Sequence, residues 1–588
     1  MIRQTALRGS EHVQKNHRHL QIPLTSPVDE LPEKLRKRLE KSWAGVFYRE
    51  FFCRLNEAPF EVLYVDFPSR PNVPVNVLVG LEYLKAGNGW TDEEMYDNYC
   101  YDMQLRYALG LRQLGEGDFD LRTLYYFRER LSRYMQEKGV NLLDQAFEQV
   151  TDQQIVAFRL KTGKQRMDST QLASNIRRVG RVQLLVEVLQ RVQRMLTGSD
   201  QEHYAADFAP YVQGHAGQYV YHMKTEETDA HLQRIGEFMQ RLLIELQPLY
   251  ATEPVYQVLE RVFGEHFRLE QQNVVTIPNR DLSGTSLQSP DDLEATYRKK
   301  QGKGYHGYVA NLSETCDPQN PLQLITKVQT ASNATDDSQL LAEALPDLKK
   351  RTELDTIYTD GGHGGPDSDL VLQQQKVEHI QTAIRGRTPD PEKLYLADFA
   401  IKFNPDNQPI KVTCPHGQTE PAHPSSQKKN FVAHFNAGVC LTCPLVDKCP
   451  AQPGKRDPRR HVRFTQAQAQ ASERRRRSRE QQKEGRNLRA AVEATIRSIK
   501  HPFPAGKLPV RGKFRIASMV IGSAAVSNVR RIQRYQQAKP KAKTAQPVAP
   551  GAEKRTQKRA GDSFWTFLCT SLATLCGFAR PKMFVVSC

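Results

Sequence analysis

Apolar residues recur with a helical period over much of the first third of the chain. Residues 46–135 show this spacing most clearly. Within them, Thr91 precedes an acidic run in which Glu94 comes three residues later, which predicts a helix start closed by a capping box. A second helix is predicted over residues 121–131. Its nearby faces contain Leu124, Phe127, Arg128 and Leu131. We therefore expect a polar arm over residues 1–45, followed by a helical N-terminal domain over residues 46–135 that either contacts DNA or packs against the rest of the chain.

The periodicity changes further along the chain. Residues 181–275 contain long apolar runs at helical spacing and are predicted to be inserted helices. Short β-type runs and a helix then follow in the order strand 305–310, strand 324–328, helix 336–350 and strand 356–359. Strands that come first and then alternate with helices are typical of a mixed sheet, so we expect a fold of the α/β class.

The amphipathic helix predicted over residues 488–500 has an unusual charged side. Its apolar stripe is formed by Leu488, Val492, Ile496 and Ile499. Beside this stripe runs a charged row: Arg486, Arg489, Glu493, Arg497 and Lys500. Ordinary ion pairs along a helix explain the single carboxylate, but they leave a surplus of three positive charges. A metal-ligating acid flanked by cations that grip phosphate groups explains both features.

The net charge indicates a polyanionic partner. The chain carries a formal net charge of +17, and residues 451–540 alone contain 23 Lys and Arg against 5 Asp and Glu. Nucleic acid is the first candidate for such a partner, and a solvated basic face is the alternative. A dense arginine run over residues 474–479 lies in the same segment and is suited to following a phosphate backbone.

Neither end of the chain predicts export or membrane insertion. The first 12 residues lack the apolar core of a secretory signal. The most apolar stretch, residues 564–579, has 16 residues, whereas a spanning helix needs about 20. We expect a cytoplasmic protein with no membrane contact, in which residues 540–562 form a linker to an apolar tail of unassigned role.

Two aspartates are candidates for catalysis. Asp168 and Asp360 each stand where a predicted strand ends, which places a carboxylate at the rim of a sheet where a metal or substrate can reach it. The glycines that follow Asp360 leave the space beside it free of side chains. Either residue, taken singly, is also a common turn or cap residue.

The acids and their neighbours resemble a known family. The pattern Arg489-x3-Glu493-x6-Lys500 resembles the third-acid signature of insertion-sequence transposases of the DDE class, with Arg486 in place of the signature tyrosine. Asp168 in Met-Asp-Ser-Thr and Asp360 in Thr-Asp-Gly-Gly resemble the first and second acids. The N-terminal block resembles the InsH-type helical domain of the same transposases in residues 90–94, 105–111 and 123–131. The resemblance covers roughly residues 50–535, and the insertion at 181–275 is longer than the usual connection.

The resemblance implies a ribonuclease-H-like catalytic domain over residues 150–539. In it, Asp168, Asp360 and Glu493 would hold two Mg²⁺ or Mn²⁺ ions for cleavage of DNA and strand transfer at transposon ends. The implied DNA contacts are made by Arg486, Arg489, Arg497 and Lys500. Double-stranded DNA is the expected partner, a homodimer is expected to hold the two ends, and the protein is expected at the nucleoid when bound to DNA.

Other interpretations stay open at this point. The chain could be a DNA-binding protein that has lost catalysis, although acids at all three positions argue against this. It could also be a ribonuclease-H-like nuclease that cuts without joining. Glu378 is a rival third acid, but its surroundings lack the cationic helix around Glu493.

Four of the ten cysteines cluster as metal ligands do. They are Cys414, Cys440, Cys443 and Cys449. Their spacing suits tetrahedral Zn²⁺, and His416, His434 or His461 could replace one of them. Four protein ligands would leave no open position, so we predict a structural zinc site in an insertion over residues 410–465, between the second and third acids. Four free buried thiols are the alternative, and the sparse, scattered remaining cysteines favour a reducing compartment.

Overall fold

The computed structural model describes residues 16–21, 25–64, 72–113, 115–300, 302–382, 390–425, 430–454, 458–484 and 488–538. The first 15 residues of the predicted arm, Arg486, and the predicted linker and tail over residues 540–588 lie outside these ranges.

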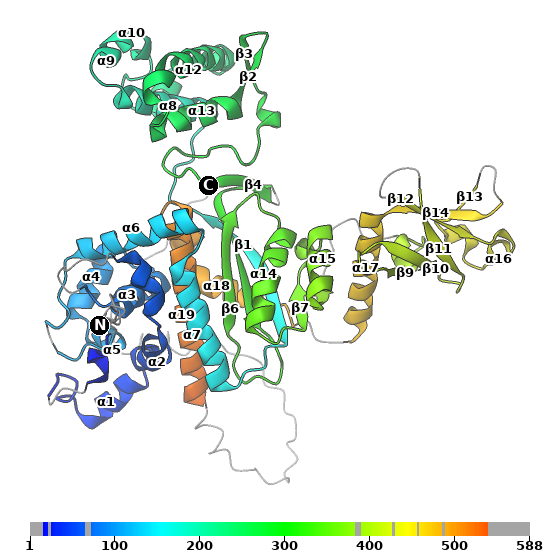
Figure 1. The fold of residues 1–588 in the computed structure, drawn as a ribbon, viewed down its shortest axis with the longest axis horizontal. Helices are drawn as coiled ribbons and strands as arrows, with labels where there is room; N and C mark the ends of the chain where they lie inside the picture. The colour runs from blue at the N-terminus through cyan, green and yellow to red at the C-terminus, as the bar shows by residue number, and fades with distance from the viewer. Residues whose placement is uncertain are drawn as a thin grey trace, which may run out of the picture. The chain divides into compact units, whose positions relative to one another are not determined.

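A six-stranded mixed sheet is built from segments far apart in the sequence (Figure 1). Its strands are β1 (Lys164–Ala173), β4 (Thr296–Lys300), β5 (Lys303–Thr315), β6 (Ile325–Ser332), β7 (Thr356–Thr359) and β8 (Glu378–Gln381). β1 lies between β5, to which it is antiparallel, and β7, to which it is parallel. β4 and β6 pair with the other edge of β5, and β8 lies parallel to β7. The mixed α/β sheet is thus confirmed, and β7 has the predicted bounds.

Hydrophobic cores cover both faces of this sheet. Two helices connect its later strands: α14 (Asp337–Arg351) and α15 (Pro366–Gln375). Successive residues of a strand point to opposite faces, so Met167 and Leu172 of β1 lie on different sides. Met167 packs with α14 in one core, and α14 has nearly the predicted bounds. Leu172 and Tyr308 belong to a second core that includes the helices before the sheet.

Helices dominate the segment before the sheet, as the apolar spacing predicts for residues 46–135; one further helix lies within the predicted polar arm and another follows residue 135. They are α1 (Glu33–Glu40), α2 (Trp43–Glu50), α3 (Val75–Asn88), α4 (Asp92–Tyr101), α5 (Met103–Ala108), α6 (Leu121–Lys138) and α7 (Leu142–Phe158). The capping box of α4 is confirmed: the Glu94 N–H donates to the Thr91 hydroxyl at 3.1 Å, and the Thr91 N–H donates to the Glu94 carboxylate at 2.8 Å. In α6, Arg128 pairs with Glu82 and Asp92 at 2.6 Å each, so its charge is used inside the protein.

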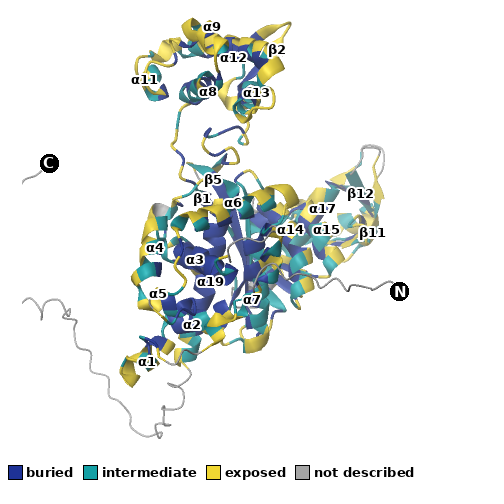
Figure 2. Cartoon of the chain, turned by 60° about the vertical axis from the view of Figure 1, so that its left-hand side comes forward, coloured by how far each residue is buried: buried dark blue, intermediate teal, exposed yellow. Residues whose placement is uncertain are grey.

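The last described helix, α19 (Lys513–Ala538), packs closely on α3. A Cβ atom at Gly522 would lie 2.7 Å from Ala86, and one at Gly87 would lie 2.4 Å from Val526, so only glycine fits at either position. Figure 2 shows both helices largely in the colour of buried residues. The small residues of α19 therefore allow the two helices to pack closely. None of the helices in the described ranges is long and apolar enough to cross a membrane.

The segment between β1 and β4 contains inserted helices with a core of their own. They are α8 (Arg181–Met195), α9 (Ser199–His203), α10 (Ala205–Phe208), α11 (Ala216–Tyr221), α12 (Thr228–Tyr250) and α13 (Pro254–His266), followed by a hairpin of β2 (Phe267–Glu270) and β3 (Asn273–Thr276). Leu189, Ile235 and Leu259 are fully buried in this core. The helical character predicted for residues 181–275 is confirmed up to the hairpin.

A second, antiparallel sheet of six strands follows β8 along the chain. Its strands are β9 (Ala400–Phe403), β10 (Pro409–Thr413), β11 (Thr419–Pro424), β12 (Asn430–Phe435), β13 (Gln452–Pro453) and β14 (Arg460–Thr465). The short helix α16 (Ala437–Leu441) lies between β12 and β13, and α17 (Gln466–Glu484) leaves the sheet. The predicted cysteine-rich segment is thus mostly β structure.

The arginine run lies on α17, and most of its charges are paired within the protein. Arg474 pairs with Asp369 of α15, and Arg479 pairs with Asp398 at 2.5 Å. Arg476 and Arg477 pair with Glu473 of the same helix. Two of these pairs link α17 to neighbouring segments. Because acidic side chains neutralise most of the arginines, the unpaired positive charge on this helix is smaller than the sequence suggests.

Candidate active site

Neighbouring strands bring Asp168 and Asp360 together. In the parallel pair of β1 and β7, Arg166 is opposite Tyr358, and each aspartate comes two residues later. Asp360 directly follows β7, as predicted. The prediction that Asp168 ends a strand is wrong, because β5 is long enough to continue pairing with β1 as far as Ala173. Asp168 is therefore a buried residue inside the sheet rather than at its rim.

Asp360 is held as an anion by its own turn. It caps the short 3-10 helix η6 (Gly361–His363), where it accepts hydrogen bonds at 2.8 Å from the Gly362 N–H and from Nδ1 of His363. Burial raises the pKa of this carboxyl, but the bonds and charge from His363 and the Gly362 N–H outweigh it, so the pKa lies well below the usual range. The glycines of this turn, singled out in the sequence, allow the chain to fold back on the carboxylate.

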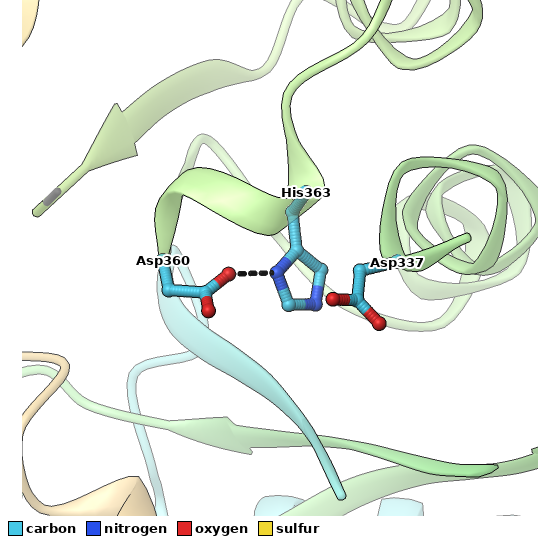
Figure 3. Close-up of side chains that lie close together, drawn as sticks. All are labelled: Asp337, Asp360 and His363. Atoms are coloured by element: carbon cyan, nitrogen blue, oxygen red, sulfur yellow. Dashed lines mark hydrogen bonds and ion pairs between the residues drawn. The ribbon is translucent and has the colours of Figure 1, made fainter. Parts of the chain in front are cut away.

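Asp337 and His363 join this group, and neither was predicted from the sequence. Asp337 is the first residue of α14, is 2% exposed, and accepts a hydrogen bond from the Ser169 hydroxyl at 2.7 Å. Asp337, Asp360 and His363 each offer one donor atom, and these atoms lie within 4.8 Å of one another (Figure 3). Within the described ranges this is the only such group of histidine, cysteine or acidic residues.

Arg489 links the first and third predicted acids. One guanidinium nitrogen lies 2.8 Å from Oδ2 of Asp168, and another lies 3.7 Å from Oε1 of Glu493. Burial raises the pKa of Asp168; the Arg489 charge opposes this shift, and the nearby Asp360 adds to it. Glu493 has a side chain that is 53% exposed, so it stands at the open side of this group.

The helix that carries Glu493 is shorter than predicted. α18 spans Val492–Lys500, and the residues from Leu488 to its start form a turn in which the Leu488 carbonyl accepts a hydrogen bond from Arg166 at 2.8 Å. Val492 and Ile499 of the predicted apolar stripe are buried, and Ile496 packs against the same core.

The predicted DNA contacts have different environments. Arg489 is bonded to Asp168, and Arg497 is exposed. Lys500 donates from Nζ to the Gln171 carbonyl of β1 at 2.7 Å. Burial lowers the pKa of Lys500, and the positive charges of the neighbouring Lys303 and Lys300 add to this shift.

Glu378, the rival third acid, lies at the wrong end of its strand. It begins β8 and pairs with Thr356, four residues before Asp360. At about 3.3 Å per residue, this offset corresponds to roughly 13 Å along the sheet. Glu493 instead pairs with Arg489, which contacts Asp168, so the geometry favours Glu493 as the partner of Asp168 and Asp360.

The four clustered cysteines line one small cavity at the end of the second sheet. His416 also lines it, whereas His434 and His461 are cross-strand neighbours on β12 and β14 outside its lining. Burial raises the pKa of Cys449, and the nearby Cys440 and Cys414 add to the shift. In the described ranges, no three of the cysteine sulfurs lie within 4.8 Å of one another, so the thiols share a cavity without the close spacing of a formed metal site.

A family comparison bears on the same segment. Residues 413–533 match a transposase DDE domain. The match begins just before Cys414, includes Arg489 and Glu493, and ends within α19; Asp168 and Asp360 precede it. No curated protein and no solved structure matches the chain.

A transposase DDE domain implies a DNA transaction related to transposition, phosphoryl-transfer chemistry and divalent metals. The mixed sheet with its helical N-terminal region is consistent with the ribonuclease-H-like fold of such domains.

The acids beside the matched DDE segment fit divalent cations chemically. Carboxylate oxygens are the ligands that Mg²⁺ and Mn²⁺ prefer. Asp168, Asp337 and Asp360 supply such oxygens from three elements; Asp168 and Asp337 are buried, and Asp360 is partly buried. Carboxylates gathered this closely need positive charge nearby, which Arg489 supplies to Asp168, while His363 hydrogen-bonds to Asp360.

A buried carboxylate that sequence reasoning missed fixes the DDE segment to the sheet. Glu314 of β5 is fully buried and accepts from Arg166 at 2.6 Å, from Arg531 at 2.7 Å and from the Thr495 hydroxyl at 2.8 Å. These partners lie on β1, α19 and α18. The position of Glu493 therefore depends on an ion-pair network around Glu314.

Proposed function

We propose that this protein is a transposase that cleaves DNA at transposon ends and joins those ends to target DNA. Asp168, Asp360 and Glu493 would hold two Mg²⁺ or Mn²⁺ ions. The observation that carries the proposal is the contact of Arg489 with both Asp168 and Glu493, because it joins the acid of the matched DDE segment to the strand that neighbours Asp360.

The carboxylates of the site would bind the cations, and Arg489 would exchange one anionic partner for another. The cations, when bound, supply activation of the attacking water or 3′-hydroxyl and stabilisation of the leaving 3′-oxygen. Asp360 is kept ionised by His363 and is ready to bind a cation. Without DNA, Arg489 forms an ion pair with Asp168. When DNA binds, the Arg489 side chain would pair with a phosphate group instead, which would leave the Asp168 carboxylate available as a metal ligand.

DNA contacts would extend from α18 along the adjacent hairpin. We assign this role to Arg489, Arg497, Lys500 and Arg486, together with the lysines at 300 and 303. The helical domain at 46–135 would bind the transposon end, and the catalytic domain at 150–539 would include insertions at 181–275 and 410–465. Two chains would pair on DNA to hold two ends, at the nucleoid of the cytoplasm.

Strand-transfer assays on a labelled transposon end test this function. The native chain should cleave and join with Mg²⁺ or Mn²⁺ and do neither with EDTA. Asp360→Asn should lower both rates by about a thousandfold, because loss of a metal ligand removes several kcal/mol of transition-state stabilisation. Asp367→Asn, an exposed neighbour on α15, should leave the rates unchanged. Cleavage without joining would indicate a nuclease, and binding alone a protein that has lost catalysis; either result contradicts the proposal.

We further propose a structural zinc ion in the cavity lined by Cys414, Cys440, Cys443 and Cys449. Small movements of the thiols would close a tetrahedral shell, and burial of Cys449 is better tolerated as a zinc-bound thiolate than as a free one. Metal analysis of the purified chain should find about one zinc per chain, and Cys443→Ser should lose most of it. Cys53→Ser, outside the cluster, is the control. Equal zinc in the two variants would refute the site.

A further inference from the structure

Asp337, Asp360 and His363 form a group that the three predicted acids do not include. Asp337 begins α14, whereas Asp360 and His363 lie at the two ends of the turn after β7 (Figure 3). Asp337 is 2% exposed and His363 is fully buried, so the group faces the interior between α14 and the sheet. We propose that these residues bind a divalent cation through mixed carboxylate and imidazole ligands, which makes Asp337 and His363 metal ligands of this protein. Because Asp360 is shared, the site would serve the proposed transposase chemistry.

The spacing of the donor atoms suits one ion. Two ligands at about 2.1 Å from a cation lie roughly 3.0 Å apart at a right angle and about 4.2 Å apart on opposite sides. Nδ1 of His363 lies 2.8 Å from Oδ1 of Asp360, and the whole group lies within 4.8 Å. In Figure 3 the imidazole lies between the two carboxylates, with Nδ1 toward Asp360 and its other nitrogen toward Asp337, so the side chains would have to rotate to direct one donor from each residue to a single ion.

The three side chains are held in place by neighbours of different elements. Ser169 of β1 donates to Asp337, and the Gly362 N–H donates to Asp360. The backbone carbonyl of His363 accepts a hydrogen bond from the Ser368 hydroxyl at 3.0 Å. Nε2 of the His363 ring lies 3.4 Å from the Asn311 amide oxygen. Ligands positioned in this way by surrounding hydrogen bonds are a general feature of metal centres.

The charge balance also favours a cation here. The buried carboxylates of Asp168 and Asp337 and the partly buried carboxylate of Asp360 lie near the guanidinium of Arg489 and the imidazole of His363. The guanidinium of Arg489 is directed to Asp168 and Glu493. A dication at Asp337 and Asp360 would offset the repulsion between the buried carboxylate of Asp337 and the partly buried carboxylate of Asp360.

An imidazole ligand determines which cations bind best. Mg²⁺ prefers oxygen ligands alone, whereas Mn²⁺ and Co²⁺ accept nitrogen more readily. We therefore expect Mn²⁺ to bind more tightly than Mg²⁺ in the absence of DNA. The competing explanation is that His363 carries a proton and braces the two carboxylates without any metal.

Binding of Mn²⁺ to the full-length chain without DNA separates these explanations. Titration followed by electron paramagnetic resonance should show a bound ion, and Asp337→Asn should weaken its affinity at least tenfold. Asp336→Asn is the matched control, since Asp336 is the exposed neighbour and makes no side-chain cap to α14. It should change the affinity less than twofold. Equal affinities in the two variants would overturn the proposal.

A spectroscopic readout keeps the test valid if a variant folds poorly. Pulsed measurements on Mn²⁺ bound to the native chain should show coupling to a histidine ¹⁴N nucleus, and His363→Gln should remove it. Bound Mn²⁺ without nitrogen coupling would overturn the proposal. If the native chain carries out strand transfer but Asp337→Asn binds Mn²⁺ as tightly as the native chain does, this site is refuted and the transposase function stands. The reverse result, with a metal site but no DNA chemistry, would refute the function alone.

Discussion

Glu493→Gln should abolish DNA cleavage and strand transfer while DNA binding persists. The amide keeps the size of the side chain but loses the negative charge that would hold a cation beside Asp168. Loss of about 4 kcal/mol of transition-state stabilisation corresponds to roughly a thousandfold in rate. Glu493 is half-exposed on α18 and its pair with Arg489 is long, at 3.7 Å, so its replacement should change DNA affinity less than about threefold. Cleavage of a labelled transposon end and a gel-shift titration measure the two effects.

The matched control for this experiment is Glu378→Gln. Glu378 is equally an exposed glutamate, but the register of β7 and β8 places it at the opposite end of the sheet from Asp360. Its replacement should leave cleavage within about twofold of the native rate. If Glu493→Gln still cleaves, Glu493 is not the third acid. Asp337, which lies beside Asp360, would then be the residue to replace next.

Local sequence signals predicted local structure well. The capping box at Thr91 and Glu94 depends on residues three apart, and both of its hydrogen bonds are present. The strand that ends before Asp360 has the predicted bounds because its apolar run and glycine-rich turn are both local. The apolar stripe of α18 is likewise visible in the spacing of its own residues.

Errors arose where distant segments decide the local conformation. Asp168 lies inside β1 because β5, more than a hundred residues later, supplies partners up to Ala173. The helix with Glu493 begins at Val492 because Leu488 and Arg489 bond instead to Arg166 and Asp168. A spacing rule contains no information about either partner.

The missed members of the candidate site were also hidden by their local roles. Asp337 follows another aspartate at a helix start, which is an ordinary place for an acid. Only the crossing of α14 between β6 and β7 brings it to Asp360. His363, three residues after Asp360, was the available signal, because that spacing lets an imidazole reach back to the carboxylate.

Glu314→Ala should cause the largest loss of stability among single replacements in the sheet. The carboxylate is fully buried and accepts charged hydrogen bonds from Arg166 and Arg531. Removing it leaves two guanidinium groups without their anion in the interior, which typically costs about 3–5 kcal/mol. Chemical denaturation should show this decrease in the free energy of unfolding. Glu343→Ala, an exposed glutamate on α14, should change it by less than about 0.5 kcal/mol.

The same replacement should affect catalysis through α18. Thr495 of this helix donates to Glu314, so the network fixes the helix that presents Glu493 and Arg489 to Asp168. Where the Glu314→Ala chain remains folded at low temperature, its cleavage rate should fall while its affinity for DNA changes little, because the charged surface is intact. A loss of less than about 1 kcal/mol would mean that solvent or another anion replaces Glu314. In that case the arrangement of β1, α18 and α19 would have to depend on their shared hydrophobic core, in which Ile499 and Ile516 are buried.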